Sequence, residues 1–284
     1  MHHAALLLIR GLSFPGILPS KPAPAIKSTM NTDNGLLVEH NGDVLRLTLN
    51  RPEKRNALSL SLLDDLGSTL RENNDTPVKC AVITGAGDRC FAAGGDLQEL
   101  DAIRTEDEAR AMSERGHSAL DEVRYFPVPV IGALNGLALG GGAELAMACD
   151  IRIATEHADL GLIHAQLNVT TAWGGGIDLI NAIGNSAALA ILCSGQRLAA
   201  AEARQLRLYE AICPADKDFA GFTADFLNRI LSKSLNVLRG YKATSAVRRR
   251  KLQDQLMMTA REEFIKAWTH EDHWQAVEQA LKKR

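Results

Sequence analysis

The chain lacks the patterns that mark metal-binding, disulfide-rich and membrane-spanning proteins. Its five cysteines include no C-x-x-C pair, and several stand in apolar surroundings, so we predict free thiols in a reducing compartment. The stretch His270-Glu271-Asp272-His273 separates its histidines by three positions, whereas H-E-x-x-H needs four. The apolar run at residues 4–9 is too short to cross a bilayer. These absences predict a protein without a bound metal and without a membrane segment.

Net charge is also nearly absent. The chain has 32 basic and 34 acidic residues, a formal net charge of −2, which does not favour non-specific nucleic-acid binding. The basic run at 248–251 falls in a helical pattern, and we interpret it as a solvated face. With 46% hydrophobic and 23% charged residues among 284, the composition is that of a soluble globular enzyme with one large domain and a smaller appendage.

Acidic residues are missing from the N-terminal stretch before Asp33, which also holds four prolines. No lysine or arginine precedes its apolar run, which argues against a cleaved secretory signal, and basic residues are sparse for an organelle transit peptide. We therefore predict a flexible leader over residues 1–33, with Met1 or Met30 as the start of translation. A cytoplasmic location is favoured over the mitochondrial matrix.

From residue 36 onward, strand and helix patterns alternate. The segment 44–49 alternates apolar and polar side chains, and Asn41-Gly42 predicts a hairpin turn before it. A helix is expected to start at Ser59 or Ser61. Its buried face would carry four leucines, at positions 62, 63, 66 and 70.

Past Gly174 the pattern becomes almost wholly helical. The fold class predicted is therefore α/β, with a core over residues 34–215 and a helical region over residues 216–284. In that region, Thr269 is expected to cap the last helix. Four apolar residues at four-residue steps are expected to form a core or subunit face: Leu252, Leu256, Ala260 and Phe264.

Two turns rich in small residues follow predicted strands. Residues 140–144 read Gly-Gly-Gly-Ala-Glu, and a helix that starts there presents bare N–H groups beside the carboxylate of Glu144. Residues 92–95 are also small, which lets a ligand approach the backbone closely. Each turn alone is compatible with tight packing, and Leu145 excludes the G-x-G-x-x-G dinucleotide pattern. Together they predict two sets of backbone donors for a developing oxyanion, with an acid/base group in reach.

These segments resemble the crotonase (enoyl-CoA hydratase/isomerase) superfamily in order and spacing across about residues 36–284. The matching stretches are NRPEKRNAL at 50–58, FAAGGDL at 91–97, NGLALGGGAEL at 135–145, ACD at 148–150, WGG at 173–175 and AAEAR at 200–204. The resemblance implies a spiral of ββα turns with a C-terminal helical trimerisation region, and trimers that pair into hexamers. It also implies an acyl-CoA substrate, with coenzyme A as part of the substrate and no separate cofactor.

The resemblance also assigns roles to individual residues. The thioester oxygen would lie between the backbone N–H groups of Gly95 and Gly141, and an enolate would be stabilised there. Coenzyme A and the acyl group would lie near six residues: Arg55, Ala57, Ala93, Asp96, Leu97 and Trp173. For Asp96 a helix cap, and for Trp173 plain core filling, remain alternatives.

One departure from the superfamily pattern concerns the reaction. Hydratases of the family use two carboxylates on one water; the first corresponds to Glu144, but His164 occupies the position of the second. A histidine ahead of Trp-Gly-Gly is most similar to the ethylmalonyl-CoA decarboxylase branch. Loss of carbon dioxide from a 2-alkylmalonyl-CoA needs no activated water, so we favour decarboxylation. His164 would orient or protonate the substrate, and Glu144 would protonate it or position His164.

Two alternatives stay open at this point. The chain could be an enoyl-CoA hydratase or isomerase that uses Glu144 as its sole carboxylate, or a non-catalytic acyl-CoA-binding member of the superfamily. The two donor turns together with Glu144 argue against the second alternative.

Overall fold

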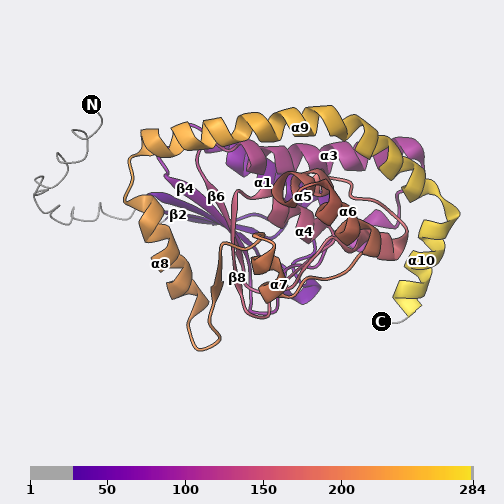
Figure 1. The fold of residues 1–284 in the computed structure, drawn as a ribbon, viewed down its shortest axis with the longest axis horizontal. Coiled ribbons are helices and arrows are strands. Elements are labelled where there is room, and N and C mark those ends of the chain that lie inside the picture. Colours follow the sequence, from indigo (N-terminus) through magenta and orange to yellow (C-terminus); the bar gives the residue numbers. More distant parts are fainter. Residues whose placement is uncertain (1–27, 283–284) are drawn as a thin grey trace, which may run out of the picture.

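The computed structural model describes residues 28–282, and within this range the strands form two sheets (Figure 1). The large sheet has seven strands in the order β1-β2-β3-β4-β6-β8-β10, and the small sheet has three in the order β5-β7-β9. The strands are β1 (Ser28–Asn31), β2 (Leu36–Asn41), β3 (Val44–Leu49), β4 (Cys80–Gly85), β5 (Cys90–Ala92), β6 (Val130–Leu134), β7 (Leu137–Leu139), β8 (Ile151–Thr155), β9 (Leu160–Gly161) and β10 (Ala211–Cys213).

From β4 onward, consecutive strands alternate between the two sheets. β4, β6 and β8 are parallel neighbours in the large sheet, and the strand that follows each of them, β5, β7 or β9, lies parallel to its neighbours in the small sheet. A helix follows each strand pair: α3 (Glu106–Tyr125, after the short α2, Leu97–Leu100), α4 (Gly141–Ala148) and α5 (Gly175–Ile183). This repetition confirms the predicted ββα spiral and the α/β class.

The large sheet begins earlier than the sequence predicts. β1 pairs antiparallel with β2 from Ser28 to Asn31, inside the range assigned to a flexible leader. Pairing covers the edge of β2, which would otherwise present unpaired backbone groups. Met30, one of the two predicted start sites, lies within β1. The rest of the predicted leader, residues 1–27, and Met1 lie outside the described residues.

The hairpin and the first long helix form as predicted. β2 and β3 pair antiparallel across a tight turn, with Asn41 opposite Val44. α1 (Leu60–Glu72) begins after Ser59, whose hydroxyl accepts a hydrogen bond from the N–H of Leu62 and so caps the helix. The four predicted leucines of its inner face are fully buried. Cap and apolar face together fix the start and the rotation of this helix.

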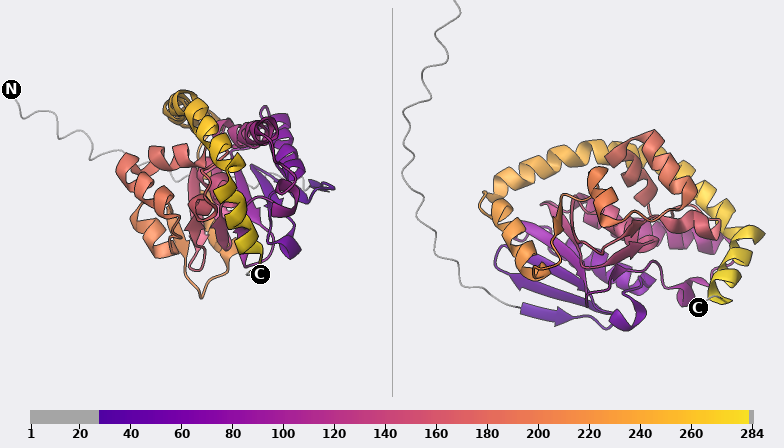
Figure 2. Two further views of the ribbon diagram at one scale, coloured as in Figure 1. Left: turned by 90° about the vertical axis from the view of Figure 1, so that its right-hand side faces the viewer. Right: turned by 60° about the horizontal axis from the view of Figure 1, so that its bottom comes forward.

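The chain past Gly174 contains one strand that the sequence analysis missed, because β10 is only three residues long and pairs parallel with β8. The other elements there are helices: α6 (Asn185–Ser194), α7 (Ala200–Gln205), α8 (Phe219–Leu231), α9 (Leu235–Thr269) and α10 (Glu271–Lys282). α9 runs along α3 and α5, and α10 turns down from its far end (Figures 1 and 2). The predicted trimer or hexamer stays a prediction, as do the domain boundaries.

Two details of α9 differ from the expectations. Its buried face follows the helical period of 3.6 residues, so Gln253 and Met257 are buried while Leu252 and Leu256 are half-buried. Thr269 ends α9 and donates its hydroxyl proton to a carbonyl of the same helix, so it does not cap α10. The N–H of Asp272, in the first turn of α10, instead bonds to Nδ1 of His270.

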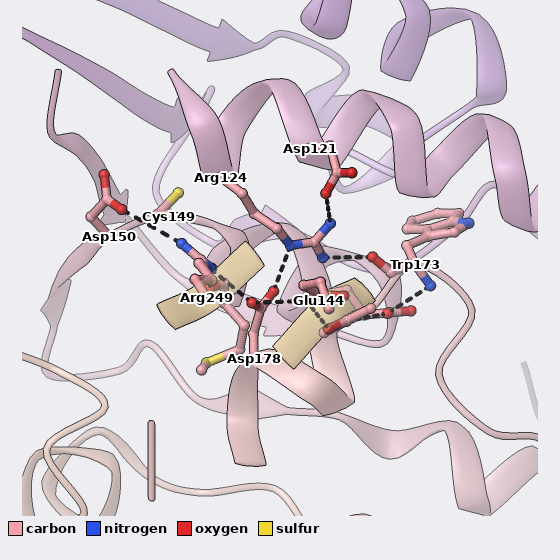
Figure 3. Close-up of polar contacts among 12 residues, drawn as sticks. Asp121, Arg124, Glu144, Cys149, Asp150, Trp173, Asp178 and Arg249 are labelled. Carbon is pink, nitrogen blue, oxygen red and sulfur yellow. Dashed lines mark hydrogen bonds and ion pairs between the residues drawn. The ribbon is translucent and has the colours of Figure 1, made fainter. Parts of the chain in front are cut away.

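The basic run at 248–251 is not simply a solvated face. Arg249 reaches inward, where its Nε lies 2.9 Å from Oδ1 of the buried Asp178, and it also pairs with Asp150. Arg124 contacts the other carboxylate oxygen of Asp178 at 2.9 Å (Figure 3). Burial by itself raises the pKa of the Asp178 carboxyl, but the two guanidinium charges outweigh burial and hold that pKa below its usual range. The sequence could not show that Asp178 lies opposite Arg249.

We expect Arg249→Met to lower the free energy of unfolding by about 3 kcal/mol at pH 7, because it removes one of the charged side chains from a buried network of ion pairs. The stability that Asp178 contributes is complete above the pKa of an unfolded aspartate, about 3.9, and is lost as the pH falls toward the folded-state pKa. The variant should therefore lose less stability than the wild type on acidification below that value. Urea unfolding at a series of pH values measures both effects.

The neighbouring Arg248 is exposed and provides the matched control. Arg248→Met should change the unfolding free energy by no more than about 0.5 kcal/mol. Equal losses in the two variants would contradict the role assigned to Arg249.

In the part of the chain that the structure describes, no helix combines the length and the apolar character that a membrane crossing requires.

Candidate active site

Three loops that are far apart in the sequence meet at one cavity. They carry Ala93–Gly95 after β5, Gly140–Gly141 after β7, and His164 in the short helix η2 (Ile163–Leu167) after β9. Because β5, β7 and β9 are parallel neighbours, their carboxyl ends lie at the same edge of the small sheet, where ligands of α/β proteins bind. The cavity has a volume of about 150 Å³. The topology of the small sheet therefore brings the separate motifs together.

The N–H groups of Gly95 and Gly141 have no hydrogen-bond acceptor within residues 28–282. Gly141 is the first residue of α4, where N–H groups lie outside the intrahelical pattern and the helix dipole favours negative charge. Gly95 lies in a parallel bridge with Leu58. The residues on either side of Gly95 make the hydrogen bonds of this bridge, and the N–H of Gly95 makes none of them. Both glycines line the cavity. They meet the first requirement of an oxyanion site, which is a pair of unused backbone donors at one cavity wall.

The carboxylate of Glu144 is buried and fully occupied. Oε1 accepts a hydrogen bond from the N–H of Ala172 at 3.1 Å, and Oε2 accepts from Trp173 at 2.9 Å and from Gly175 at 2.8 Å (Figure 3). Nε2 of His164 lies 3.2 Å from Oε1. Four donors thus surround a carboxylate, which can accept about four hydrogen bonds.

These contacts decide the charge of Glu144. Burial by itself raises the pKa of this carboxyl, but the hydrogen bond and charge of His164 and the two N–H groups of Gly175 and Trp173 outweigh burial, and the pKa lies below its usual range. Glu144 is therefore ionised at neutral pH. The ionised carboxylate is suited to hold His164 in place and has no free oxygen lone pair with which to activate a water molecule.

His164 presents its second ring nitrogen without a partner. Because Nε2 donates to the Glu144 carboxylate, Nδ1 is the nitrogen left to exchange a proton with a ligand. Nδ1 is buried and makes no hydrogen bond to the described residues, and the side chain lines the cavity. The structure therefore places His164 and Glu144 at the same cavity as the two glycines.

Trp173 forms the wall between the two donor loops. Its indole packs so close to α4 that a Cβ added at Gly141 would lie 2.3 Å from Cζ3, and one added at Gly116 of α3 would lie 2.2 Å from Nε1. Glycine at both positions leaves room for the ring. Trp173 belongs to the hydrophobic core and also lines the cavity, and its contact with the substrate stays a prediction.

The C-terminal helices supply a wall that the sequence analysis did not identify as part of the site. Trp268 of α9 packs against His273 and, edge to face, against Trp274 of α10, with ring centroids 4.6 Å and 5.5 Å away. His273 donates from Nδ1 to the carbonyl of Leu167 in η2, which holds α10 over the cavity. The only sequence feature that could have indicated this wall is the run of aromatic residues at the junction of the last two helices.

The other predicted binding residues fall in and beside the loop at 93–97. Ala93 lines the cavity, and its N–H donates to the carbonyl of Arg55, so the loop at 55–57 lies alongside. The carboxylate of Asp96 pairs with Arg51 at 2.9 Å and Lys54 at 3.4 Å and does not line the cavity; its contact with coenzyme A stays a prediction. Leu97 is the first residue of α2.

Cysteine and metal-ligand patterns in the structure are simple. All five cysteines are free thiols, as predicted, and four of them are buried. Between residues 28 and 282, no group of three or more histidine, cysteine, aspartate or glutamate side chains is arranged as a metal site.

Comparison with known proteins decides the family. Residues 39–284 match the family model described as enoyl-CoA hydratase/isomerase. The chain belongs to this family. It is therefore an acyl-CoA-processing enzyme of the crotonase superfamily, which confirms the sequence resemblance.

Individual relatives agree with this assignment. The short-chain-enoyl-CoA hydratase of Clostridium acetobutylicum is 33% identical over 202 residues, which cover 71% of this chain and 77% of the relative. The 2,3-dehydroadipyl-CoA hydratase of Escherichia coli is 38% identical over 182 residues, which cover 64% of this chain and 70% of that protein. The crystal structure of an enoyl-CoA hydratase/isomerase from Mycobacterium paratuberculosis superposes with a TM-score of 0.80 at 25% identity, over 88% of this chain and 100% of the other.

Proposed function

We propose that this enzyme removes carbon dioxide from a 2-alkylmalonyl-CoA, with ethylmalonyl-CoA as the substrate that its sequence resemblance implies. The observation that carries the proposal is the environment of Glu144. Its carboxylate is occupied by three backbone N–H groups and His164, so it has no free lone pair with which to activate a water molecule. The other carboxylate at the cavity, Asp101, is exposed and pairs with Arg104 at 2.6 Å. A reaction that needs an enolate but no water fits these residues.

The reaction follows from the groups at the cavity. The bond between the α-carbon and the carboxylate breaks, and its electron pair moves into the thioester to give an enolate as carbon dioxide leaves. The enolate oxygen accepts hydrogen bonds from the N–H groups of Gly95 and Gly141, each of which contributes a few kcal/mol. A proton on Nδ1 of His164 is then transferred to the α-carbon, and solvent returns a proton to the ring. No further cofactor is needed, because the thioester itself takes up the electron pair.

The walls of the cavity favour loss of the carboxylate. Apolar side chains from α2, α3 and α9 surround the donor loops, among them Leu100, Met112 and Phe264. A carboxylate moved from water into such surroundings loses hydration, whereas neutral carbon dioxide and a hydrogen-bonded enolate lose less.

The second candidate is an enoyl-CoA hydratase. The names of the relatives from Clostridium acetobutylicum and Escherichia coli favour it. Against it stands His164 at the position of the second carboxylate, together with the saturated carboxylate of Glu144. Binding without catalysis is a weaker alternative, since it gives no role to the unpartnered Nδ1 of His164.

A side-by-side assay distinguishes these functions. The purified protein is given ethylmalonyl-CoA, crotonyl-CoA and a 3-enoyl-CoA, and release of carbon dioxide, hydration and double-bond migration are followed. We expect kcat/KM for carbon dioxide release to exceed that of the other two reactions. Faster hydration of crotonyl-CoA would contradict the proposal and favour the second candidate, and turnover of none of the three would favour a binding protein.

A further inference from the structure

The turn that binds the Glu144 carboxylate is itself fixed by hydrogen bonds from side chains to its carbonyl oxygens. Two of its peptide groups point their N–H toward Glu144, and each has its carbonyl oxygen on the opposite side. The first of these peptide groups joins Ala172 to Trp173. Its carbonyl oxygen accepts a hydrogen bond from Oγ of Ser113 at 2.7 Å. The second peptide group joins Gly174 to Gly175. Its carbonyl oxygen accepts a hydrogen bond from Nε2 of Gln253 at 3.1 Å.

The carbonyl between these two is fixed as well. Nη2 of Arg124 donates to the carbonyl of Trp173 at 2.6 Å, and the guanidinium is held in turn by Asp121 and Asp178 (Figure 3). Gln253 also donates to Asp178, at 3.1 Å. The three carbonyl oxygens of residues 172–174 are therefore all bound by buried side chains of α3 and α9.

We propose that Ser113 and Gln253 are positioning residues for the active site. They orient two of the three peptide groups whose N–H groups hold the Glu144 carboxylate, and Glu144 holds His164. This inference rests on the catalytic roles proposed for Glu144 and His164.

The physical reason is the planarity of the peptide group. Because N–H and C=O of one trans peptide point in opposite directions in one plane, a bond that fixes the carbonyl also fixes the direction of the N–H. Neither Ser113 nor Gln253 lines the cavity, and both are buried polar side chains, which is costly unless their hydrogen bonds are used. The long helix α9, through Gln253, thus contributes to the proton-transfer geometry from outside the cavity.

Gln253→Met tests the inference, because methionine keeps the length of the side chain and removes the donor. We expect hydrogen exchange of the Trp173 and Gly175 amides to become about tenfold faster, and kcat to fall about tenfold with KM unchanged, since a misplaced catalytic group slows the chemical step. The kinetics use whichever of the three acyl-CoA substrates the wild type turns over. Gln255→Met is the matched control, because Gln255 lies on the same helix and is exposed.

Ser113→Ala provides an independent second variant, for which we also expect kcat to fall while KM stays unchanged. Ser118 on α3 is exposed, so Ser118→Ala supplies its control. Unchanged amide exchange and kcat in Gln253→Met and Ser113→Ala would overturn the inference. So would a rise in KM at constant kcat, or equal effects in the controls. If the wild type releases no carbon dioxide from ethylmalonyl-CoA, the proposed reaction fails, whereas faster amide exchange in Gln253→Met but not Gln255→Met would still support the positioning role.

Discussion

Glu144→Gln is expected to lower kcat by about 10²- to 10⁴-fold, the range over which acid–base groups contribute to catalysis. The carboxamide keeps the shape of the side chain but turns one acceptor oxygen into an NH₂ donor. That donor would face the N–H groups of Ala172, Trp173 or Gly175, or Nε2 of His164, all of which need an acceptor. His164 then loses its orientation. The unfolding free energy should also fall by about 1–3 kcal/mol, because a buried donor is left unpaired.

Steady-state kinetics with ethylmalonyl-CoA and urea unfolding measure the two effects of Glu144→Gln. Glu156 is exposed, so Glu156→Gln makes the same chemical change where no such contacts exist and should leave kcat unchanged. A Glu144→Gln enzyme that keeps kcat within tenfold of the wild type would show that the carboxylate does not act in the reaction.

Gly141→Ala is expected to reduce kcat by about 10²- to 10³-fold, which is the loss observed when one oxyanion donor is removed. The added Cβ would lie 2.3 Å from Cζ3 of Trp173, so either the indole or the start of α4 must move. Both movements displace the N–H of residue 141 from its cavity position. Overpacking at this buried site should also lower the unfolding free energy by about 1–3 kcal/mol.

Gly240 offers the matched control for this substitution, because it lies in α9 and a Cβ there meets no atom within 4 Å. Gly240→Ala should leave kcat unchanged and raise stability slightly, since alanine is the better helix former. The double variant Gly141→Ala/Trp173→Leu should recover stability, because the smaller side chain relieves the clash. Wild-type kcat in Gly141→Ala would remove Gly141 from the oxyanion site.

Local features of this fold could be predicted from the sequence, and long-range ones could not. The hairpin at Asn41-Gly42 and the capped start of α1 at Ser59 depend on nearby residues, and both form as expected. The position of Arg249 depends on Asp178, which is 71 positions away in the sequence. Nothing in a run of basic residues shows which of them turns inward, so the solvated-face interpretation was wrong for Arg249.

The features of the candidate site also divide into those that could be predicted from the sequence and those that could not. The glycine turns, Glu144 and His164 could be identified because their motifs are short and contiguous. That they share a cavity follows from the parallel order of β5, β7 and β9, which the pattern of apolar residues does not encode. The wall made by α10 was missed because His273 meets Leu167 across 106 positions. Contacts of this kind are fixed by packing of whole elements.

Decarboxylation of ethylmalonyl-CoA labelled with ¹³C in its free carboxyl group and run in D₂O tests the central claim most directly. The claim is that an enolate forms at the N–H groups of Gly95 and Gly141 and is protonated there by His164. It predicts release of ¹³CO₂ and a product with a single deuterium on one face of the α-carbon. Deuterium on both faces would mean that the enolate leaves the site before it is protonated, and absence of ¹³CO₂ would mean that it never forms; either result would contradict the claim.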